Sequence, residues 1–439
     1  MTTQSADASA ARRQPVWIGG AWVQACAPQV RECLNAATLA PLGAVPECGD
    51  LDLAAALDAA AGAQAAWRAT PAASRMERLA RVGARLRSRA AGIARSLTQE
   101  FGKPLCESID EIAAAADCFC SSAEQAPTTA ASSPAGIDGI LGSGDLPIWG
   151  TADRVAAALA AGRCVVCVTS PQAPMTGLLL AECYDALPAG VVNVLAGAAE
   201  LTTALSARLG GRTGGAELSG RGARGAVPAI VLSDADLDLA VPGVAWLALR
   251  NAGQTYGARA QLYVDRAIAP AFADRLHEYM AFLEVGDPLK PDTDLGPLHS
   301  HEAVRRAEEQ VARASKDGAR IKLGGRAFRP WGLPGHFFQP TILFDVKRDS
   351  FAAREEILAP VVSIMPVDGL DDALDRTRAL TCVGAEIHTR DATLAAQALR
   401  SIRLAESLSG APASRPALVH VMARQSAWFP YSARERRAG

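Results

Sequence analysis

The chain has 439 residues, of which 49% are hydrophobic and 21% are charged. This length and composition predict two or three globular domains with buried cores. The formal net charge at pH 7 is only -2. A chain so close to neutral generates no long-range field that would recruit nucleic acid or an anionic membrane, so we expect neither as a partner.

The N-terminal segment and the cysteines indicate the cellular compartment of the protein. Residues 1–14 are polar and lack the apolar core of a signal peptide, which predicts a disordered leader. No apolar run reaches the length of a membrane span. Ten cysteines are scattered along a chain with no export signal, which indicates reduced thiols and a cytoplasmic location.

The cysteines and histidines do not predict a metal site. Cys164 and Cys167 have C-x-x-C spacing, but no second pair lies at zinc-ligand spacing. Because they fall in a β-branched run, we interpret them as a buried structural pair. His299 and His301 lie two residues apart in a predicted loop and are interpreted as surface polar residues.

The predicted elements change character along the chain. Helical stretches cover residues 50–67 and 74–96, and the second opens with a capping-box pattern at Ser74. From about residue 164, short β-branched runs alternate with helical segments, which predicts α/β layering with parallel sheet. Two small-residue stretches have no apolar period: residues 121–136 are expected to form a flexible connector, and residues 210–225 a loop.

A series of short motifs resembles the aldehyde dehydrogenase superfamily from about residue 16 almost to the end. The motifs follow the order of that family: VWIGG (16–20), FGKP (101–104), ALAAG (158–162), PAGVVNV (188–194), DADL (234–237), VGDPL (285–289), FQPTIL (338–343) and EEI (355–357). The resemblance implies an α/β fold with two Rossmann-like parallel-sheet domains. Fold alone does not establish activity, so the site residues need separate inspection.

The resemblance also divides the chain into domains. It implies a cofactor-binding-type domain over residues 15–120 and 134–222, and a catalytic-type domain over residues 223–405. Residues 121–133 form a shortened connector where family members carry an oligomerisation hairpin. Residues 406–439 resemble a truncated form of the C-terminal segment. The elements that join subunits are therefore expected to be reduced.

The stretch NAGQTYGA (251–258) resembles the nucleophile motif of the family, N-x-G-Q-x-C-x-A. In that motif the cysteine thiolate attacks the aldehyde carbon, and here Tyr256 stands in its place. A phenol has a reference pKa of about 10 against about 8.5 for a thiol, and its oxygen forms no thioester. No cysteine lies between Cys183 and Cys382 to replace it.

Two further catalytic positions of the family are changed. The asparagine that stabilises the oxyanion aligns with Asp145, so an amide donor is replaced by a group that accepts when ionised. The general-base glutamate of the ELGGK motif aligns with Gly222. Glu217, in a nearby Glu-Leu-Ser-Gly, is the alternative base if the loop has shifted.

The cofactor positions of the family are also eroded. The lysine that holds the adenosine ribose aligns with Val168, and the glutamate of the KPSE motif aligns with Pro171. Residues 197–234 are shorter than the family pattern by about a helix and a strand, the part that carries F-T-G-S and cradles the pyrophosphate. Glu356 matches the glutamate that holds the nicotinamide ribose, but the companion phenylalanine is Leu358. We expect no cofactor, or NAD(P) if any binds.

These changes leave three functions open. The leading hypothesis is a catalytically inactive aldehyde dehydrogenase homologue with a structural or regulatory role, partnered with an intact aldehyde dehydrogenase or a pathway enzyme. The first alternative is an NAD(P)-dependent oxidoreductase that acts on an aldehyde through a rearranged site. The second is a small-ligand-binding protein whose cleft is lined by Asp145, Tyr256 and Glu356. The sequence identifies no substrate.

Overall fold

The computed structural model describes residues 14–125, 136–210, 213–215, 227–255, 261–378, 380, 382, 385–402 and 419–421. The chain divides into two compact units. Unit 1 comprises Met1–Phe101 and Leu105–Gly222, and unit 2 comprises Gly102–Pro104 and Ala223–Gly439. Residues 1–13, most of the expected connector and most of residues 406–439 lie outside the described residues. In the described part of the chain, no helix is both long and apolar enough to cross a membrane.

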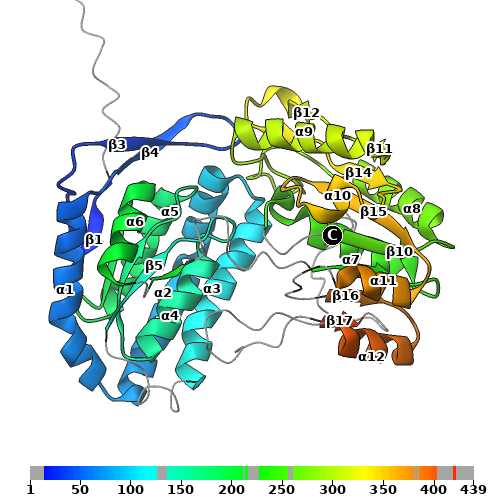
Figure 1. The fold of residues 1–439 in the computed structure, drawn as a ribbon. Helices are drawn as coiled ribbons and strands as arrows, with labels where there is room; N and C mark the ends of the chain where they lie inside the picture. The colour runs from blue at the N-terminus through cyan, green and yellow to red at the C-terminus, as the bar shows by residue number, and fades with distance from the viewer. Residues whose placement is uncertain are drawn as a thin grey trace, which may run out of the picture. The chain divides into compact units, whose positions relative to one another are not determined.

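Unit 1 is built on a six-stranded sheet with the order β2-β1-β7-β6-β5-β8 (Figure 1). The four strands from β7 to β8 run parallel, and the antiparallel pair β1 and β2 extends the opposite edge. The strands are β1 (Val16–Ile18), β2 (Ala21–Val23), β5 (Ile137–Leu141), β6 (Cys164–Val168), β7 (Val192–Leu195) and β8 (Thr213–Gly215). Strands β3 (Val30–Leu34) and β4 (Pro41–Pro46) form a separate antiparallel pair. The α/β fold expected from the sequence is confirmed, with mixed sheets.

The helices of unit 1 differ from the sequence expectation at several ends, and α1 and α2 continue to Ala69 and Phe101, beyond the predicted residues 67 and 96. They are α1 (Asp50–Ala69), α2 (Ala72–Phe101), α3 (Leu105–Gln125), α4 (Trp149–Ala160), α5 (Pro174–Leu179), η1 (Leu180–Ala186) and α6 (Ala199–Arg208). The predicted start of α2 at Ser74 is wrong, because the Arg75 amide already donates to the Pro71 carbonyl at 3.0 Å. The predicted connector is wrong for residues 121–125, which continue α3 because Ala, Glu and Gln favour the helix.

The predicted loop over residues 210–225 is wrong for β8, which pairs in parallel with β5. A glycine-rich strand has no apolar period, but its backbone groups can still complete the ladder of an edge strand. Residues 216–225 lie outside the described residues. Cys164 and Cys167 are buried, unbonded thiols on β6, as expected from their β-branched surroundings.

Two helices of unit 1 begin without a capping side chain of their own. Neither Ile148 before α4 nor Ala173 before α5 supplies one. Instead, the buried carboxylate of Glu111 accepts from the Ile148 and Trp149 amides at 2.8 and 3.1 Å. At α5, Glu100 accepts from the amides of residues 175 and 176 at 2.8 Å each. Carboxylates from distant helices therefore satisfy the free N–H groups and complement the helix dipoles.

Unit 2 is built on a seven-stranded sheet with the order β11-β14-β15-β10-β9-β16-β17. Six strands run parallel, and β11 pairs antiparallel with β14. The strands are β9 (Ala229–Val231), β10 (Gln261–Asp265), β11 (Arg320–Leu323), β14 (Thr341–Phe344), β15 (Val361–Val367), β16 (Ala385–His388) and β17 (Val419–Val421). Strands β12 (Ala327–Phe328) and β13 (Phe337–Phe338) form a separate pair.

The seven-stranded sheet separates two apolar cores. Alternate residues of each strand enter different clusters, as Ile230 and Val231 of β9 show. One cluster takes residues from α7 and α8, and the other takes residues from α9, α11 and α12. The helices are α7 (Leu237–Leu249), η2 (Arg250–Gly253), α8 (Ala269–Ala281), α9 (His301–Lys316), η3 (Pro330–Gly332), α10 (Phe351–Arg354), α11 (Leu370–Thr377) and α12 (Ala392–Ser401). Because helices cover both faces of this sheet, its strands have near-continuous apolar sequences.

Candidate functional site

The segment that follows α7 has an unusual backbone. Asn251 and Ala252 adopt left-handed φ values of 52° and 51°, and Gly253 follows with a φ of 71°. A Cβ added at Gly253 would lie 2.0 Å from the Ala359 carbonyl oxygen. Only glycine therefore fits this position, and a left-handed alanine is strained. Strained backbone of this kind is concentrated at functional sites, although it does not by itself identify a function.

Buried polar contacts hold this segment in place. The Gln254 side-chain amide donates to the Asn251 carbonyl at 3.0 Å. The Gln254 Oε1 atom accepts from the His299 backbone N–H at 2.9 Å and lies 2.8 Å from His299 Nδ1. Because an amide oxygen only accepts, Nδ1 of His299 carries the proton in this contact. His299 is exposed, as the sequence predicted for a surface polar residue, and it also anchors the loop through these contacts.

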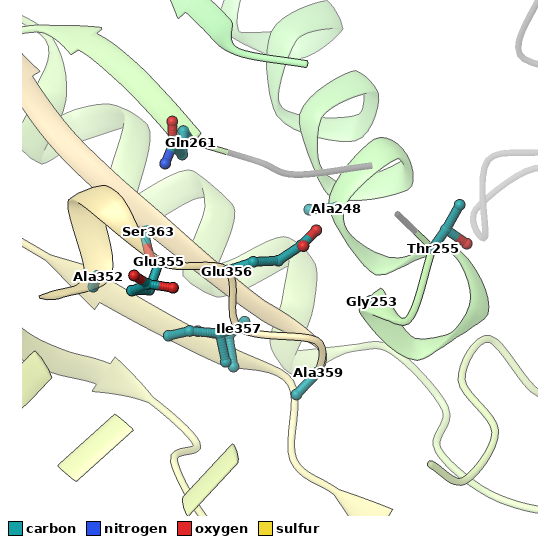
Figure 2. Close-up of a pocket in the computed structure, with 11 residues that line it drawn as sticks. Ala248, Gly253, Thr255, Gln261, Ala352, Glu355, Glu356, Ile357, Ala359 and Ser363 are labelled. Atoms are coloured by element: carbon teal, nitrogen blue, oxygen red, sulfur yellow. The ribbon is translucent and has the colours of Figure 1, made fainter. Parts of the chain in front are cut away.

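A pocket lies beside this segment within unit 2 (Figure 2). Its walls come from α7, the strained loop, the residues around α10, and the starts of β10 and β15. The lining residues are Ala248, Gly253, Thr255, Gln261, Ala352, Glu355, Glu356, Ile357, Ala359, Val361 and Ser363. Two carboxylates, two hydroxyls and one amide supply its polar groups.

The polar lining residues are positioned by their neighbours. The Glu356 carbonyl accepts from the Gln310 side chain at 3.0 Å, which fixes the backbone from which the Glu356 side chain extends. The Gln261 amide donates to the Ala353 carbonyl at 3.0 Å, and its oxygen accepts from the Tyr263 hydroxyl at 3.4 Å. In Figure 2 the Glu356 carboxylate points along the pocket toward Ala248. Leu358 is half-buried and is not among the described residues that line the pocket.

Of the predicted catalytic positions, the structure describes only Asp145. Tyr256, Gly222 and Glu217 lie outside the described residues. The Oδ1 atom of Asp145 accepts from the Ser143 hydroxyl at 2.5 Å and from the Leu146 amide at 3.0 Å. Asp145 therefore stabilises its own turn between β5 and α4.

The sheet of unit 1 places the predicted cofactor positions where a nucleotide would be expected. Strands β5, β6 and β7 run parallel, and ligands of such sheets bind at the carboxyl ends of the strands. Val168 ends β6 and is buried, with its carbonyl accepting from the Gly142 amide at 2.8 Å. Pro171 is exposed in the turn that follows. Neither side chain can hydrogen-bond a ribose hydroxyl.

The neighbouring side chains at this edge of the sheet do not supply the hydrogen-bonding groups that Val168 and Pro171 lack. Thr169 and Ser170 are buried, and the Ser170 hydroxyl oxygen accepts from the Gln172 amide at 3.3 Å. Helix α6, which follows β7, carries Glu200 in its first turn, where a carboxylate opposes the binding of a second anion. The described residues at this edge therefore do not fit the adenosine and pyrophosphate of a nicotinamide dinucleotide.

The buried thiols of Cys164, Cys167 and Cys382 are poor nucleophiles. Cys382, the only cysteine in the sequence of unit 2, is 1% exposed. Its sulfur lies 3.9 Å from the Thr377 carbonyl oxygen, and burial raises its pKa. In unit 1, burial raises the pKa of Cys164 and Cys167 to about 12 each. Reactive cysteines have lowered pKa values, so these thiols are structural.

The sequence places the F-T-G-S segment in the part that the chain lacks, and this stays a prediction. Strand β8, with the sequence Thr213-Gly214-Gly215, lies in the same interval and pairs with β5. For metals, no group of three or more His, Cys, Asp or Glu side chains in the described ranges is arranged to hold an ion.

Comparison with known proteins places this geometry in a family. The profile of the aldehyde dehydrogenase family matches residues 22–210 and 222–409. The chain is 33% identical over 388 residues to the NADP+-dependent succinate-semialdehyde dehydrogenase of Escherichia coli, covering 80% of each protein. The crystal structure of lactaldehyde dehydrogenase from Escherichia coli has a TM-score of 0.80 at 28% identity, covering 89% of this chain and 90% of that one.

The relatives also bear on the cofactor. An aldehyde dehydrogenase from Bacillus cereus, determined as an NAD+ complex, has a TM-score of 0.81 at 23% identity, a likeness of fold alone, over 90% of this chain and 87% of that one. The succinate-semialdehyde dehydrogenase is named for NADP+. These relatives favour NAD(P) and do not support the expectation of no cofactor, whereas Val168 and Pro171 at the described edge of unit 1 offer it no polar side chain.

Proposed function

Because the chain belongs to the aldehyde dehydrogenase family, we propose that it is a catalytically inactive member with a structural or regulatory role. The observation that carries the proposal is Tyr256 at the nucleophile position of a motif whose loop is otherwise kept. Left-handed Asn251 and Ala252 and the tightly packed Gly253 still shape the loop. The described loop residues therefore lead to a position that carries a phenol where the family motif has a thiol.

The described surroundings offer no substitute nucleophile of the same kind. Cys382 belongs to the apolar core of unit 2, where its high pKa keeps it protonated. None of the described residues that line the pocket is a cysteine. The family's amide donor, which contributes a factor of about 10² to 10³ in rate, is also missing at Asp145, whose Oδ1 atom is engaged in its own turn. These losses support inactivity more strongly than a rearranged oxidoreductase site.

Turnover assays test the proposal directly. The purified chain is mixed with succinate semialdehyde or lactaldehyde and with NAD+ or NADP+, and absorbance at the reduced nicotinamide band is followed. We expect no rate above an enzyme-free blank, with an intact Escherichia coli relative as the positive control. Cofactor reduction that scales with the concentration of this chain would contradict the proposal.

A second assay tests the nucleophile position without any cofactor. The Tyr256→Cys variant restores the cysteine of the family motif in the sequence that follows the described residues 251–255. We expect it to release nitrophenol from p-nitrophenyl acetate with a burst, because a thiolate attacks activated esters. Tyr256→Ala is the matched control, since it removes the ring without adding a thiol. Equal bursts from the wild type and the cysteine variant would show that another group already acts as nucleophile.

We propose that this chain, as an inactive member, acts through an intact aldehyde dehydrogenase. Addition of this chain to an intact aldehyde dehydrogenase from the same cell is expected to change the rate or thermal stability of that enzyme in a saturable way. No change at any ratio would remove the regulatory role. The alternative of a small-ligand-binding protein is favoured by one observation, the pocket of unit 2 that persists beside the altered nucleophile position.

A further inference from the structure

Unit 2 carries an exposed tryptophan on the loop that follows β12 (Figure 1). Trp331 lies in η3, between the paired strands β12 and β13, and is 85% exposed. A single exposed apolar side chain is common on proteins, but Trp331 is also fixed in place and has charged neighbours. We propose that Trp331 and these neighbours join two copies of this chain about a twofold axis. The contact goes beyond the proposed function, because it requires neither turnover nor its absence.

The backbone and the indole N–H hold Trp331 in its exposed position. Its φ of 51° is left-handed, a conformation that a bulky side chain rarely adopts. Its Nε1 atom donates to the Oε1 atom of Glu284 at 3.3 Å. The backbone of Glu284 is fixed in turn, since its N–H donates to Asp294 Oδ2 at 2.9 Å and its carbonyl accepts from the Asp294 N–H at 2.8 Å. A side chain restrained in this way loses little entropy when a partner covers it.

The ring of Trp331 and the carboxylate of Glu284 together fit an arginine side chain. A guanidinium can stack on an indole and bind a carboxylate. Elsewhere in unit 2, the guanidinium of Arg250 lies over the ring of Trp246, 4.6 Å from its centroid. In the part of the chain that the structure describes, no cation lies over Trp331 and no Lys or Arg forms an ion pair with Glu284. Both groups are therefore available to an arginine from another molecule.

The same loop supplies an arginine without a counter-ion. Arg329 is exposed, two positions before Trp331, and forms no ion pair with any described residue. The surface thus carries one uncompensated charge of each sign, at Arg329 and Glu284, beside an exposed ring. Such a surface is complementary to itself. About a twofold axis, Arg329 of each copy can reach Trp331 and Glu284 of the other, so that two ion pairs form.

Exposed apolar area beside the charges adds to the contact. Phe282, two positions before Glu284, is 72% exposed. Burying aromatic rings contributes more free energy than surface ion pairs do, so the rings of Trp331 and Phe282 are expected to supply most of the affinity. The loop and the end of α8 are small beside the roughly 1,600 Å² that a stable interface buries. We therefore expect a reversible dimer with a dissociation constant on the order of 10–100 μM.

Sedimentation velocity of the full chain, from about 1 to about 300 μM, tests the contact. We expect the wild type to dimerise reversibly and Trp331→Ala to weaken the dimer by at least about tenfold. Trp246→Ala is the matched control, because it removes an exposed ring that Arg250 already covers, and it should leave the dimer unchanged. A wild type that stays monomeric over this range would overturn the proposal. So would a Trp331→Ala dimer as tight as the wild type, or an equal loss in Trp246→Ala.

Charge reversal tests the twofold arrangement. Glu284→Arg alone and Arg329→Glu alone each place like charges opposite one another, so each variant should remain monomeric. In an equal mixture of the two variants, the new arginine meets the new glutamate and the unchanged pair is kept, so the dimer should return. A mixture that stays monomeric while both variants keep the wild-type thermal midpoint would overturn the arrangement. If a reversed variant does not fold, Glu284→Gln and Arg329→Gln replace the pair, and each should weaken the dimer about threefold or more.

Discussion

The loop after α7 in unit 2 and the sheet edge of unit 1 have changed in opposite ways. The loop keeps a conformation that costs free energy, with left-handed Asn251 and Ala252 and with Gly253 pressed against the Ala359 carbonyl. A left-handed alanine alone costs about 1–2 kcal/mol. The edge of unit 1 instead carries Val168 and Pro171, which need no partners. The described loop of unit 2 thus carries backbone strain, whereas these two aligned cofactor positions of unit 1 carry no polar side chain.

The difference teaches that backbone conformation and polar side chains at a family's site positions can vary independently. In unit 2, Gln254 and His299 hold the loop in its strained conformation. Such a conformation persists only when its surroundings over-determine it. In unit 1, Val168 and Pro171 offer a nucleotide no hydrogen-bonding side chain. Experiments that alter the loop or restore single family residues therefore test the two regions separately.

The largest expected effect comes from removing the glycine of the strained loop. Gly253→Ala places a methyl group 2.0 Å from the Ala359 carbonyl oxygen, so the loop or the neighbouring chain must move. We expect unit 2 to lose about 4 kcal/mol or more of its unfolding free energy. Hydrogen exchange followed by peptide mapping measures this in unit 2 separately from unit 1.

Gly332→Ala is the matched control for this prediction. Gly332 has a φ of 74°, almost the same as Gly253, but an added Cβ would meet nothing within 4 Å. The Gly332→Ala substitution therefore costs only the free energy of placing alanine in a left-handed backbone, about 1–2 kcal/mol. If the two variants are equally destabilised, close packing against Ala359 is not what holds the loop.

A smaller loss is expected from Glu100 in unit 1. Besides the two amides at the start of α5, its carboxylate accepts from the Thr176 hydroxyl at 2.7 Å. Glu100→Ala leaves three buried donors without this acceptor, and we expect a loss of about 3 kcal/mol in unit 1. Glu77→Ala, which removes only an exposed i,i+4 ion pair with Arg81, is expected to cost less than about 0.5 kcal/mol. Chemical unfolding followed by exchange in unit 1 peptides compares them.

Much of the fold was predictable because local patterns and ordered motifs specify it. The strand around Cys164 and the helix starting at Asp50 were expected from β-branched and alanine-rich sequence. The caps supplied by Glu100 and Glu111 were not, because each partner lies 37 or more positions away along the chain. The apolar periodicity of a sequence predicts the local structure of one element, whereas such caps depend on packing between elements.

The candidate site was predictable only in part for the same reason. The motif around Tyr256 identified the loop, since the resemblance covers consecutive residues. Gln261 and Ser363 enter the pocket from separate strands, and His299 reaches Gln254 across 45 positions. No short motif links these residues. The sheet topology brings them together, and a single sequence does not reveal such contacts.

The histidine anchor predicts a pH dependence confined to unit 2. The pKa of His299 is lowered first by burial and then by the positive charges of Arg306 and His336. Burial and His301 likewise lower the pKa of His336. Protonation is then harder in the folded chain than in the unfolded chain, whose histidine pKa is about 6.5. The unfolded state binds more protons below that value, so unit 2 loses stability as pH falls from about 7 toward 5.

Substitution identifies the histidine responsible. His299→Gln keeps the backbone N–H that reaches Gln254 but cannot take up a proton, so the decline in the unit 2 midpoint between pH 7 and pH 5 should become shallower. His277→Gln on α8 is the control and should leave the slope unchanged. Identical slopes for wild type and His299→Gln would mean that the loop anchor does not sense protons.

The smallest effect is expected at Asp145, where the family amide can be restored. Asp145→Asn retains the Oδ1 acceptor that holds the Ser143 hydroxyl and the Leu146 amide, so its stability should change by less than about 0.5 kcal/mol. Because that oxygen serves its own turn, adding Asp145→Asn to Tyr256→Cys should not raise the ester-cleavage rate. A gain of about 10²-fold, the contribution of one oxyanion donor, would show that residue 145 still acts at the reacting centre. Unit 1 would then retain a catalytic position that lacks only its amide. The two units would in that case differ at single residues and not over whole regions.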